Sequence, residues 1–285
     1  MALQMTAGKN PSDIRAQNLR LLLALLVRHR QVTRVQLARA TGLSKTSITN
    51  LVNECLQLGL IVETAESRRA HGRPAKYICL SSHAPQVIGV SVSRLYMTFT
   101  LARLDGEILS LHRHAIDARL SYETMLEHIR TGIAALMEAT TEAVVGIGIS
   151  MLGPVEPFEG VLLAPQNFML RPTVYPIAAP LRAWAGMPVQ VMHDVTAAVL
   201  AERLFNPGRS EANFGFLSLH AGVGLGLCLN HALYQGSGGF SGELGHLSIH
   251  ADGIPCACGQ RGCLERYANL DTMRERQHAL EPLFR

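Results

Sequence analysis

Four side chains that can bind a metal lie close together near the end of the sequence. Three cysteines follow the pattern C-x-C-x4-C after a histidine, and the four residues are His246, Cys256, Cys258 and Cys263. Three thiolates and one imidazole complete the tetrahedral ligand set of a structural zinc ion and leave no open coordination position. The spacing differs from the disulfide framework of a small secreted protein. We therefore expect a structural zinc site, with a cluster of free thiols as the alternative.

Two glutamates flank these four residues, Glu243 on one side and Glu265 on the other. A metal ion bound between them would hold both carboxylates in fixed positions, because its ligands are near each of them in the chain. Taken singly, each glutamate has the simpler interpretation of a solvated surface charge. The spacing therefore raises the question of what two fixed carboxylates would bind.

The composition is that of an ordinary globular protein. The 285 residues are 48% hydrophobic and 17% charged, and a chain of this length is expected to form about two domains. No apolar run approaches the ~20 residues that a membrane-spanning helix needs, and the N-terminus lacks the pattern of a secretory signal peptide. We expect a cytoplasmic protein that does not contact a membrane.

Positive charge is concentrated in the first part of the chain. Residues 1–80 contain 12 Lys and Arg against 4 Asp and Glu, whereas the remainder contains 14 against 18. All three lysines, Lys9, Lys45 and Lys76, lie in the first part. Such an asymmetry is typical of a nucleic-acid-binding domain attached to a body with another task. We expect double-stranded DNA to be a partner of this basic part.

Apolar residues recur at helical spacing three times in the basic part, after a short arm at residues 1–13. The three predicted helices, each with a residue that can cap its first turn, are 14–30 with Ser12 or Asp13, Thr33–Ala40 with Thr33, and Lys45–Leu58 with Ser44. Gly42 makes the turn between the second and third helices, and Gly59 ends the third. A helix, a glycine turn and a second helix form the helix-turn-helix pattern.

The exposed face of the third predicted helix carries small polar side chains and one lysine near its N-terminus. Such residues can pack close to base edges in the major groove and can donate and accept hydrogen bonds. The candidates for DNA contact are Lys45, Thr46, Ser47, Thr49 and Asn50. The alternative is a plain three-helix packing unit, since polar residues are common on any solvated helix face.

Two strands around a basic tip are predicted after this helix, in the manner of a wing. Four basic side chains lie on the wing: Arg68, Arg69, Arg73 and Lys76. We expect them to contact phosphates or the minor groove, which adds affinity more than sequence preference. A solvated charged loop is the alternative. The winged helix-turn-helix domain would then span residues 14–80.

The body of the chain begins near residue 84 with alternating apolar and polar residues and a turn at Asp105-Gly106, which predicts a β-meander. Helices and buried strands then alternate: we expect helices over 122–139, 177–185 and 195–204, and strands over 144–150 and 188–194. This order predicts an α/β lobe in which helices cover a sheet.

A second part of the body starts near Asn213 with a strand, a glycine-rich turn and another strand. The turn contains Gly222, Gly224 and Gly226. This spacing fits a phosphate cradle and a tight hairpin equally well, so both interpretations stay open.

The chain resembles the ROK family of repressors, uncharacterised reading frames and sugar kinases, and specifically its repressor branch. The resemblance covers nearly the whole chain from about Leu19 and lies above all in GELGH at Gly242–His246, CACGQRGCLE at Cys256–Glu265, RVQLARATGLSKTSITNLV and HGRPAKY. It implies an α/β fold with an N-terminal α winged-helix domain, followed by the actin-like sugar-kinase fold of two lobes with a sugar in the cleft. The lobes would be residues 84–205 and 206–285.

The resemblance also implies a set of sugar-binding residues. The candidates are Gly153, His193, Asp194, Glu243, His246 and Glu265. Asp194 matches the catalytic base of the kinases, which binds a sugar hydroxyl in the repressors, and His246 matches a residue that both binds zinc and lies beside the sugar. His193 replaces the asparagine that the family usually has before the aspartate. A helix N-cap is the simpler interpretation of Asp194.

Two departures from the family pattern bear on activity. The kinases carry an Asp-x-Gly-Gly-Thr loop for magnesium and phosphates, and this chain has Ser91-Val92-Ser93-Arg94-Leu95 there, without the carboxylate or the glycines. We therefore expect no enzymatic activity.

The chain also stops soon after the zinc motif, which we interpret as a C-terminal truncation with an incomplete second lobe. A compact variant is the alternative.

These observations predict a DNA-binding transcriptional regulator, a repressor of carbohydrate genes. It would respond to a sugar or sugar derivative and act as a homodimer or a higher homo-oligomer. Two alternatives remain open. One is an ATP-dependent sugar kinase with a DNA-binding appendage, which Asp194 favours. The other is a constitutive DNA binder whose body has lost its ligand, which His193 and the early stop favour.

Overall fold

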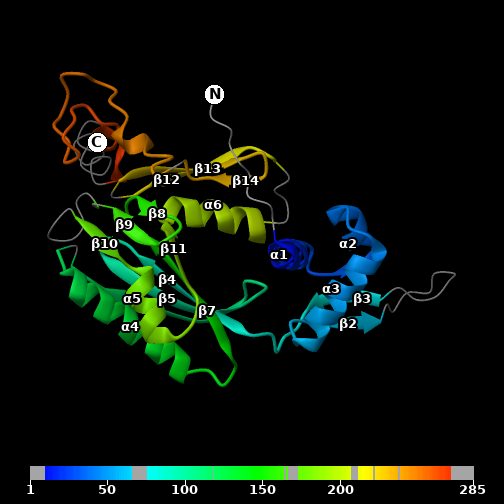
Figure 1. Ribbon diagram of the computed structural model, residues 1–285. Helices are drawn as coiled ribbons and strands as arrows, with labels where there is room; N and C mark the ends of the chain where they lie inside the picture. Colours follow the sequence, from blue (N-terminus) through cyan, green and yellow to red (C-terminus); the bar gives the residue numbers. More distant parts are fainter. Residues whose placement is uncertain are drawn as a thin grey trace, which may run out of the picture. The chain divides into compact units, whose positions relative to one another are not determined.

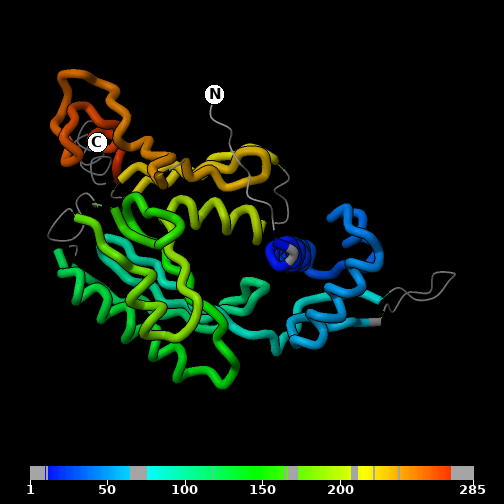
Figure 2. Tube along the Cα trace, in the orientation of Figure 1, coloured from blue at the N-terminus to red at the C-terminus, as the bar shows by residue number. Residues whose placement is uncertain are grey.

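The chain forms two compact units, which are described separately. The computed structural model describes residues 10–65, 76–117, 119–163, 165, 173–206, 211–220, 222–236 and 238–270. The first unit comprises residues 1–85 and 103–107, and the second comprises residues 86–102 and 108–285. Apart from residues 84–85 and 103–107, both lobes that were expected in the body fall within the second unit. Figure 1 labels the elements, and Figure 2 follows the Cα trace from the N-terminus to the C-terminus.

Three helices dominate the first unit: α1 (Pro11–His29), α2 (Arg34–Thr41) and α3 (Lys45–Gln57). The predicted caps of the second and third helices are confirmed. Thr33 forms a capping box with Gln36, and the Ser44 hydroxyl accepts from the Ser47 N–H at 3.1 Å. The predicted cap of α1 is wrong, because its N-cap is Asn10, without a side-chain bond. Pro11 suits the first helical position, and Ser12 and Asp13 therefore lie inside the helix.

The turns of the helix-turn-helix follow from two glycines. Gly42 is the C-cap of α2 in the left-handed region at φ 71°, and Gly59 follows α3 at φ 67°. The Leu60 N–H donates to the Cys55 carbonyl at 2.9 Å and the Gly59 N–H to the Leu56 carbonyl at 3.1 Å, which is a Schellman ending. The helices enclose one apolar core: Leu22, Leu26, Val32, Leu37, Ile48, Leu51, Val52, Cys55, Ile61 and Ile78.

A three-stranded antiparallel sheet completes this unit. Its strands are β1 (Val32–Thr33), β2 (Ile61–Ala65) and β3 (Lys76–Leu80), in the order β1-β3-β2. Two wing strands were predicted, and β1 is an addition in which buried Val32 pairs with Ile78. The predicted DNA contacts Arg68, Arg69 and Arg73 lie outside the described residues. Lys76 is the first residue of β3.

The second unit is built on a five-stranded sheet with the order β11-β7-β4-β5-β6. The strands are β4 (Gln86–Val92), β5 (Tyr96–Arg103), β6 (Ile108–Ala115), β7 (Val144–Met151) and β11 (Val189–His193). Strand β7 runs parallel to both β4 and β11, whereas β5 and β6 form the predicted antiparallel hairpin. Figure 1 shows this sheet with helices α4 (Tyr122–Glu138) and α5 (Ala178–Ala185) beside it.

Alternating residues of these strands form the main core together with α4 and α5. The inward residues include Ile88, Val90, Phe99, Ile149 and Val191 of the sheet, and the helices contribute Ile129, Ile133 and Leu181. Because strand side chains alternate between faces, the other face of β7 carries Gly146, Gly148 and Ser150. The α/β class predicted for the body is confirmed. Beside the main sheet lies a small one of β8 (Val155–Glu156), β9 (Val161–Leu163) and β10 (Val174–Pro176).

A second three-stranded sheet packs on helix α6 (Asp194–Phe205) (Figure 1). It consists of β12 (Phe214–Leu219), β13 (Val223–Leu229) and β14 (Ala232–Tyr234) in that order. Of the two interpretations of the glycine spacing, the structure supports the hairpin. Gly224 and Gly226 lie within β13 opposite Ser218 and Phe216, and the His220 N–H closes the turn on the Gly222 carbonyl at 3.0 Å.

The glycines of β13 have a packing role that the sequence did not reveal. A Cβ atom at Gly224 would lie 2.8 Å from Val195 Cγ1, and a Cβ atom at Gly226 would overlap the Val195 carbonyl oxygen. The missing side chains therefore allow the first turn of α6 to approach the strand closely. None of the helices among the described residues is both long and apolar enough to cross a lipid bilayer.

We predict that Gly226→Ala destabilises the protein by about 1–3 kcal/mol, because the added methyl group forces α6 away from β13. Gly148→Ala on β7 is the matched control, since nothing lies within 4 Å of a Cβ atom there. Urea denaturation of both variants measures the effect. Equal midpoints for Gly226→Ala and Gly148→Ala would show that the close approach is unimportant.

Candidate functional site

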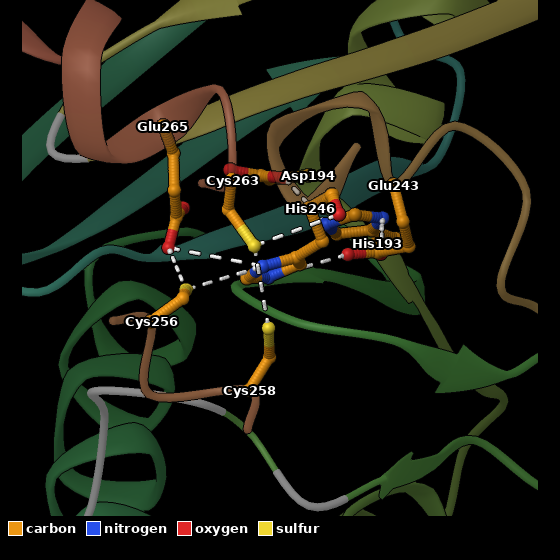
Figure 3. A network of polar contacts seen from close by, with 8 residues as sticks. All are labelled: His193, Asp194, Glu243, His246, Cys256, Cys258, Cys263 and Glu265. Carbon is orange, nitrogen blue, oxygen red and sulfur yellow. Dashed lines mark hydrogen bonds and ion pairs between the residues drawn. The ribbon is translucent and has the colours of Figure 1, made fainter. Parts of the chain in front are cut away.

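The four predicted metal ligands come together in the second unit (Figure 3). One ligand atom from each of His246, Cys256, Cys258 and Cys263 lies within 4.8 Å of all the others. His246 Nδ1 is 3.7 Å from Cys256 Sγ, and the sulfur atoms of Cys258 and Cys263 are 3.5 Å apart. A tetrahedral zinc ion would place two sulfur ligands about 3.8 Å apart and a sulfur and a nitrogen about 3.6 Å apart. The donor set and its spacing fit zinc.

Short loops that are bonded to one another position these ligands. His246 ends the 3-10 helix η1 (Leu244–His246), and Cys263 lies just before the short helix α7 (Glu265–Ala268). The Leu264 N–H donates to the Leu247 carbonyl at 2.9 Å, which ties the two ligand segments together. Within the loop between them, the Cys256 N–H donates to the Gln260 carbonyl at 2.9 Å. The motif is therefore locally specified.

The pKa values of the three thiols are shifted from that of an ordinary cysteine. Burial, and then the hydrogen bonds that the Cys263 thiol donates to Cys258 and Cys256, raise the pKa of Cys263 to about 12, and burial also raises the pKa of Cys256. For Cys258, burial acts to raise the pKa, but hydrogen bonds from the Gln260 backbone and the neighbouring thiols outweigh it and lower the pKa. Metal binding to such thiols releases protons, so affinity for the metal falls as the pH falls.

Carboxylates adjoin the four possible metal ligands directly (Figure 3). Glu265 Oε1 lies 3.6 Å from Cys256 Sγ and 3.9 Å from His246 Nδ1, and the glutamate is only 8% exposed. On the other side of the same imidazole, His246 Nε2 lies 3.9 Å from Glu243 Oε2. His246 therefore presents one nitrogen to the metal ligands and the other to Glu243.

Residues from the start of α6 complete the cluster. His193 Nδ1 lies 4.0 Å from Glu243 Oε1, and His193 Nε2 lies 3.2 Å from Asp194 Oδ1. The structure thus brings together five of the six predicted sugar ligands. The sixth, Gly153, has φ 93° in the turn after β7, where an added Cβ atom would lie 3.3 Å from Pro165 Cβ.

Two buried polar atoms of this cluster lack a hydrogen-bond partner among the described residues, namely His193 Nδ1 and Glu243 Oε1. Burial raises the pKa of Glu243, although His193 and His246 act to lower it. A buried polar atom without a partner costs about 1–3 kcal/mol. One hydroxyl group of a ligand placed between the two atoms could donate to the carboxylate and accept from the imidazole. The geometry suits a ligand with hydroxyl groups.

The simpler interpretation of Asp194, as the N-cap of a helix, is wrong in detail, because the N-cap of α6 is His193. Asp194 is the first residue of α6, which begins one residue earlier than predicted, and its Oδ1 accepts from the Val195 N–H at 2.7 Å. A carboxylate at this position is stabilised by the N-terminal end of the helix. The N-cap itself is His193, which makes no side-chain cap bond. Asp194 therefore has a local bond and still faces the cluster.

A second candidate site is the exposed face of α3 in the first unit. Of the five predicted DNA contacts there, Lys45, Thr46 and Asn50 are exposed. The other two are partly buried and use their hydroxyl groups locally. Ser47 Oγ lies 2.9 Å from Ser44 Oγ, and Thr49 Oγ1 donates to the Lys45 carbonyl at 2.8 Å. The first three are therefore the best placed for an external partner.

Lys76 makes an ion pair that the sequence did not predict. Its Nζ lies 2.9 Å from Glu63 Oε2, and Arg34 contacts the other oxygen of the same carboxylate at 2.7 Å. Hydrogen bonds from Lys76 and then from Arg34 hold the pKa of the Glu63 carboxyl below its ordinary value. Arg34 and Glu63 are 29 residues apart, so no local pattern in the sequence could have paired them. The Lys76 side chain remains 68% exposed.

Comparison with known proteins gives a family match for each part of the chain. The model of the ROK family matches residues 87–281, and the model of the MarR family matches residues 12–73. The xylose repressor of Bacillus spizizenii is 27% identical over 259 residues, which are 90% of this chain and 66% of that protein. The chain thus spans slightly less than two thirds of the length of this relative.

Two solved structures show the same fold. One is a ROK family transcriptional regulator, a homologue of the Escherichia coli MLC protein, with a TM-score of 0.76 and 27% identity over 93% of this chain and 68% of that one. The other is a ROK family glucokinase from Streptomyces griseus in complex with glucose and AMPPNP, with a TM-score of 0.61 and 26% identity over 69% of this chain and 62% of that one. These matches confirm the predicted winged helix and actin-like sugar-kinase fold.

We predict that the purified chain contains about one zinc ion and that Cys258→Ser releases it, since the remaining three ligands cannot close the tetrahedron. Elemental analysis gives the metal content, and the thermal midpoint should fall with the metal. Cys79→Ser is the control, because that thiol lies on β3, outside the cluster. Metal-free protein with the thermal stability of the metal-loaded form would contradict a structural site.

Proposed function

The chain belongs to the ROK family, and from this premise we propose that it is a sequence-specific DNA-binding transcriptional regulator with a sugar as its effector. We propose a repressor of carbohydrate genes that acts in the cytoplasm, since relatives over 90% of the chain are named xylose repressor. One observation carries the proposal: a capped helix-turn-helix with an exposed polar face belongs to the same chain as a cluster of carboxylates with unpartnered polar atoms.

The DNA-binding part of the proposal assigns residues 14–80 to a winged helix-turn-helix. Helix α3 would enter the major groove, where Lys45, Thr46 and Asn50 offer an ammonium, a hydroxyl and an amide group to phosphates and base edges. The basic residues of the wing would contact phosphates, and Lys76 can exchange its exposed ion pair with Glu63 for one with a phosphate.

The effector part assigns the cluster around Glu243 to a sugar. Asp194, Glu243 and Glu265 would accept hydrogen bonds from neighbouring hydroxyl groups, and His193 would donate or accept at its unpartnered Nδ1. Gly153 would line the same cleft. We propose that zinc, when bound by His246 and the three cysteines, has a structural role. It would hold the His246 ring and the Glu265 segment in place without taking part in any reaction.

The sugar would regulate DNA binding through the number of winged helices that can bind the DNA at the same time. We propose a homodimer or a higher homo-oligomer, because two recognition helices must fit half-sites at a fixed helical spacing. A sugar that binds one arrangement of the oligomer more tightly than another shifts the equilibrium between them, and DNA affinity changes reciprocally. The domain boundaries at residues 84–205 and 206–285 remain part of this proposal.

A sugar kinase is the second candidate, because Asp194 occupies the position of the catalytic base in the related kinases. The loop at Ser91–Leu95 favours the regulator. There the Ser93 N–H donates to the Tyr96 carbonyl at 2.8 Å, and the Tyr96 N–H donates to Ser93 Oγ at 3.0 Å. These backbone groups close a tight turn and are not available to hold phosphates.

We predict that the full chain selects preferred sequences from randomised duplexes at moderate salt, and that Asn50→Ala weakens binding to the preferred sequence about tenfold by removing a base contact. Binding to unrelated DNA should be little changed, because phosphate contacts supply that affinity. Arg182→Ala on α5 is a control for the loss of an exposed charge in the second unit. A chain that binds every duplex equally would exclude sequence-specific regulation.

We predict that one member of a panel of pentoses, hexoses and amino sugars binds the chain in calorimetry, and that Asp194→Asn weakens it at least tenfold by removing the charge on an acceptor. The variant keeps an oxygen for the Val195 N–H, so the local hydrogen bond at the start of α6 should remain. Glu127→Gln, an equal charge change at an exposed position of α4, is the control. Specific DNA binding without any sugar binding would instead favour a constitutive DNA binder.

A further inference from the structure

Four polar side chains from four elements form one series of contacts in the first unit: Lys76 of β3, Glu63 of β2, Arg34 of α2 and Asn53 of α3. Lys76 Nζ donates to Glu63 Oε2 at 2.9 Å. Arg34 donates to Glu63 Oε1 from Nε at 3.2 Å and from Nη2 at 2.7 Å, and its Nη2 also donates to Asn53 Oδ1 at 3.2 Å. One carboxylate of the wing is thereby joined to the third helix.

The pair of Arg34 and Glu63 is well suited to fix a geometry. The Glu63 side chain is 16% exposed and that of Arg34 is 33% exposed, so water screens this pair less than a fully exposed one. A guanidinium group is planar, and its two contacts with Glu63 fix the orientation of that plane. The same plane then directs Nη2 toward Asn53.

The contact with Arg34 determines how the Asn53 amide is turned. A guanidinium group has only donors, so it must meet the carbonyl oxygen of asparagine and not the NH2 group. The Asn53 side chain is exposed, and its Nδ2 has no hydrogen-bond partner within the part of the chain that the structure describes. Asn53 therefore presents an oriented donor on the surface of α3.

Asn53 shares a helix face with two of the predicted DNA contacts. Thr46, Asn50 and Asn53 follow one another at spacings of four and three, and all three are exposed. On the premise that the proposed DNA binding is right, we infer that Asn53 is a specificity-determining residue whose Nδ2 donates to a keto oxygen of a base, O6 of guanine or O4 of thymine. Arg34 and Glu63 are its positioning residues.

The preference for keto bases follows because Asn53 Oδ1 already accepts a hydrogen bond from Arg34. An asparagine with both ends free reads adenine, because it accepts from N6 and donates to N7. The Asn53 oxygen is turned toward Arg34, so an adenine that accepts from Nδ2 at N7 leaves its own amino group without an acceptor, and the cytosine amino group meets none either. Guanine offers two acceptors, N7 and O6, and thymine offers O4. Asn50, whose amide makes no hydrogen bond among the described residues, keeps the adenine contact. Two asparagines on one helix face are thus expected to read different bases.

Asn53→Asp tests the inference, because the side chain keeps its shape and an oxygen for Arg34 but loses its NH2 donor. The full-length chain and the variant each select from randomised duplexes, and base preference is compared position by position within each protein. This comparison cancels the uniform loss caused by the added negative charge. We expect the parent to prefer guanine or thymine about tenfold at one position of the half-site. The variant should lose this preference or reverse it toward cytosine or adenine.

Three further variants separate the possible outcomes. Asn50→Asp makes the same change one turn earlier and should alter a different base pair. Glu63→Gln leaves Asn53 intact but loosens Arg34, and it should weaken the preference at the Asn53 position only. Asn53→Ala decides the question if circular dichroism shows that Asn53→Asp does not fold. An unchanged keto preference in Asn53→Asp and Asn53→Ala overturns the inference, whereas a parent without any base preference overturns the proposed function instead.

Discussion

The rest of the site depends on the imidazole ring of His246, because its two nitrogens face two different groups of side chains (Figure 3). Nδ1 lies 3.7 Å from Cys256 Sγ, among the possible metal ligands, and Nε2 lies 3.9 Å from Glu243 Oε2. A metal ion on Nδ1 would fix the ring and the hydrogen-bonding character of Nε2. Glu265 borders the same ring and the same thiol. The cysteine motif and the carboxylates therefore form one structure, and a shift of the cysteine loop would move both.

The other half of the site depends on how closely α6 approaches β13. Gly224 and Gly226 leave room for Val195, which directly follows Asp194. The same strand also holds the Glu243 segment, since the Leu225 N–H donates to the Gly242 carbonyl at 3.0 Å. One glycine-bearing strand thus brings the start of α6 and Glu243 together, and His193 Nδ1 and Glu243 Oε1 are buried there without a hydrogen-bond partner among the described residues. Hydroxyl groups of a ligand could satisfy both atoms, and this is the geometric basis of the proposed sugar site.

In the first unit, local bonds determine which side chains of α3 remain available. The hydroxyl groups of Ser47 and Thr49 are used inside their own helix, as cap partner and as donor to a backbone carbonyl. Among the described residues, the amide groups of Asn50 and Asn53 and the ammonium group of Lys45 make no such local bond. Asn53 is oriented only by its contact with Arg34, which is distant in the sequence. Fewer side chains of α3 are therefore available to an external partner than the number of its polar residues suggests, and a glutamate on the wing helps to orient one of them, Asn53.

The sequence by itself determined the elements whose signals are local. Helix caps at Thr33 and Ser44, the glycine turn at Gly42 and the spacing of the metal ligands act over a few residues, so a short stretch of sequence specifies them. The winged helix and the α/β class followed from these patterns. Only the tertiary structure decided the contacts between distant residues: strand β1 on the wing, the packing role of Gly226, the meeting of His193 with Glu243, and the link from Glu63 through Arg34 to Asn53. Such pairings depend on how whole elements pack, and periodicity within one element carries no information about its neighbour.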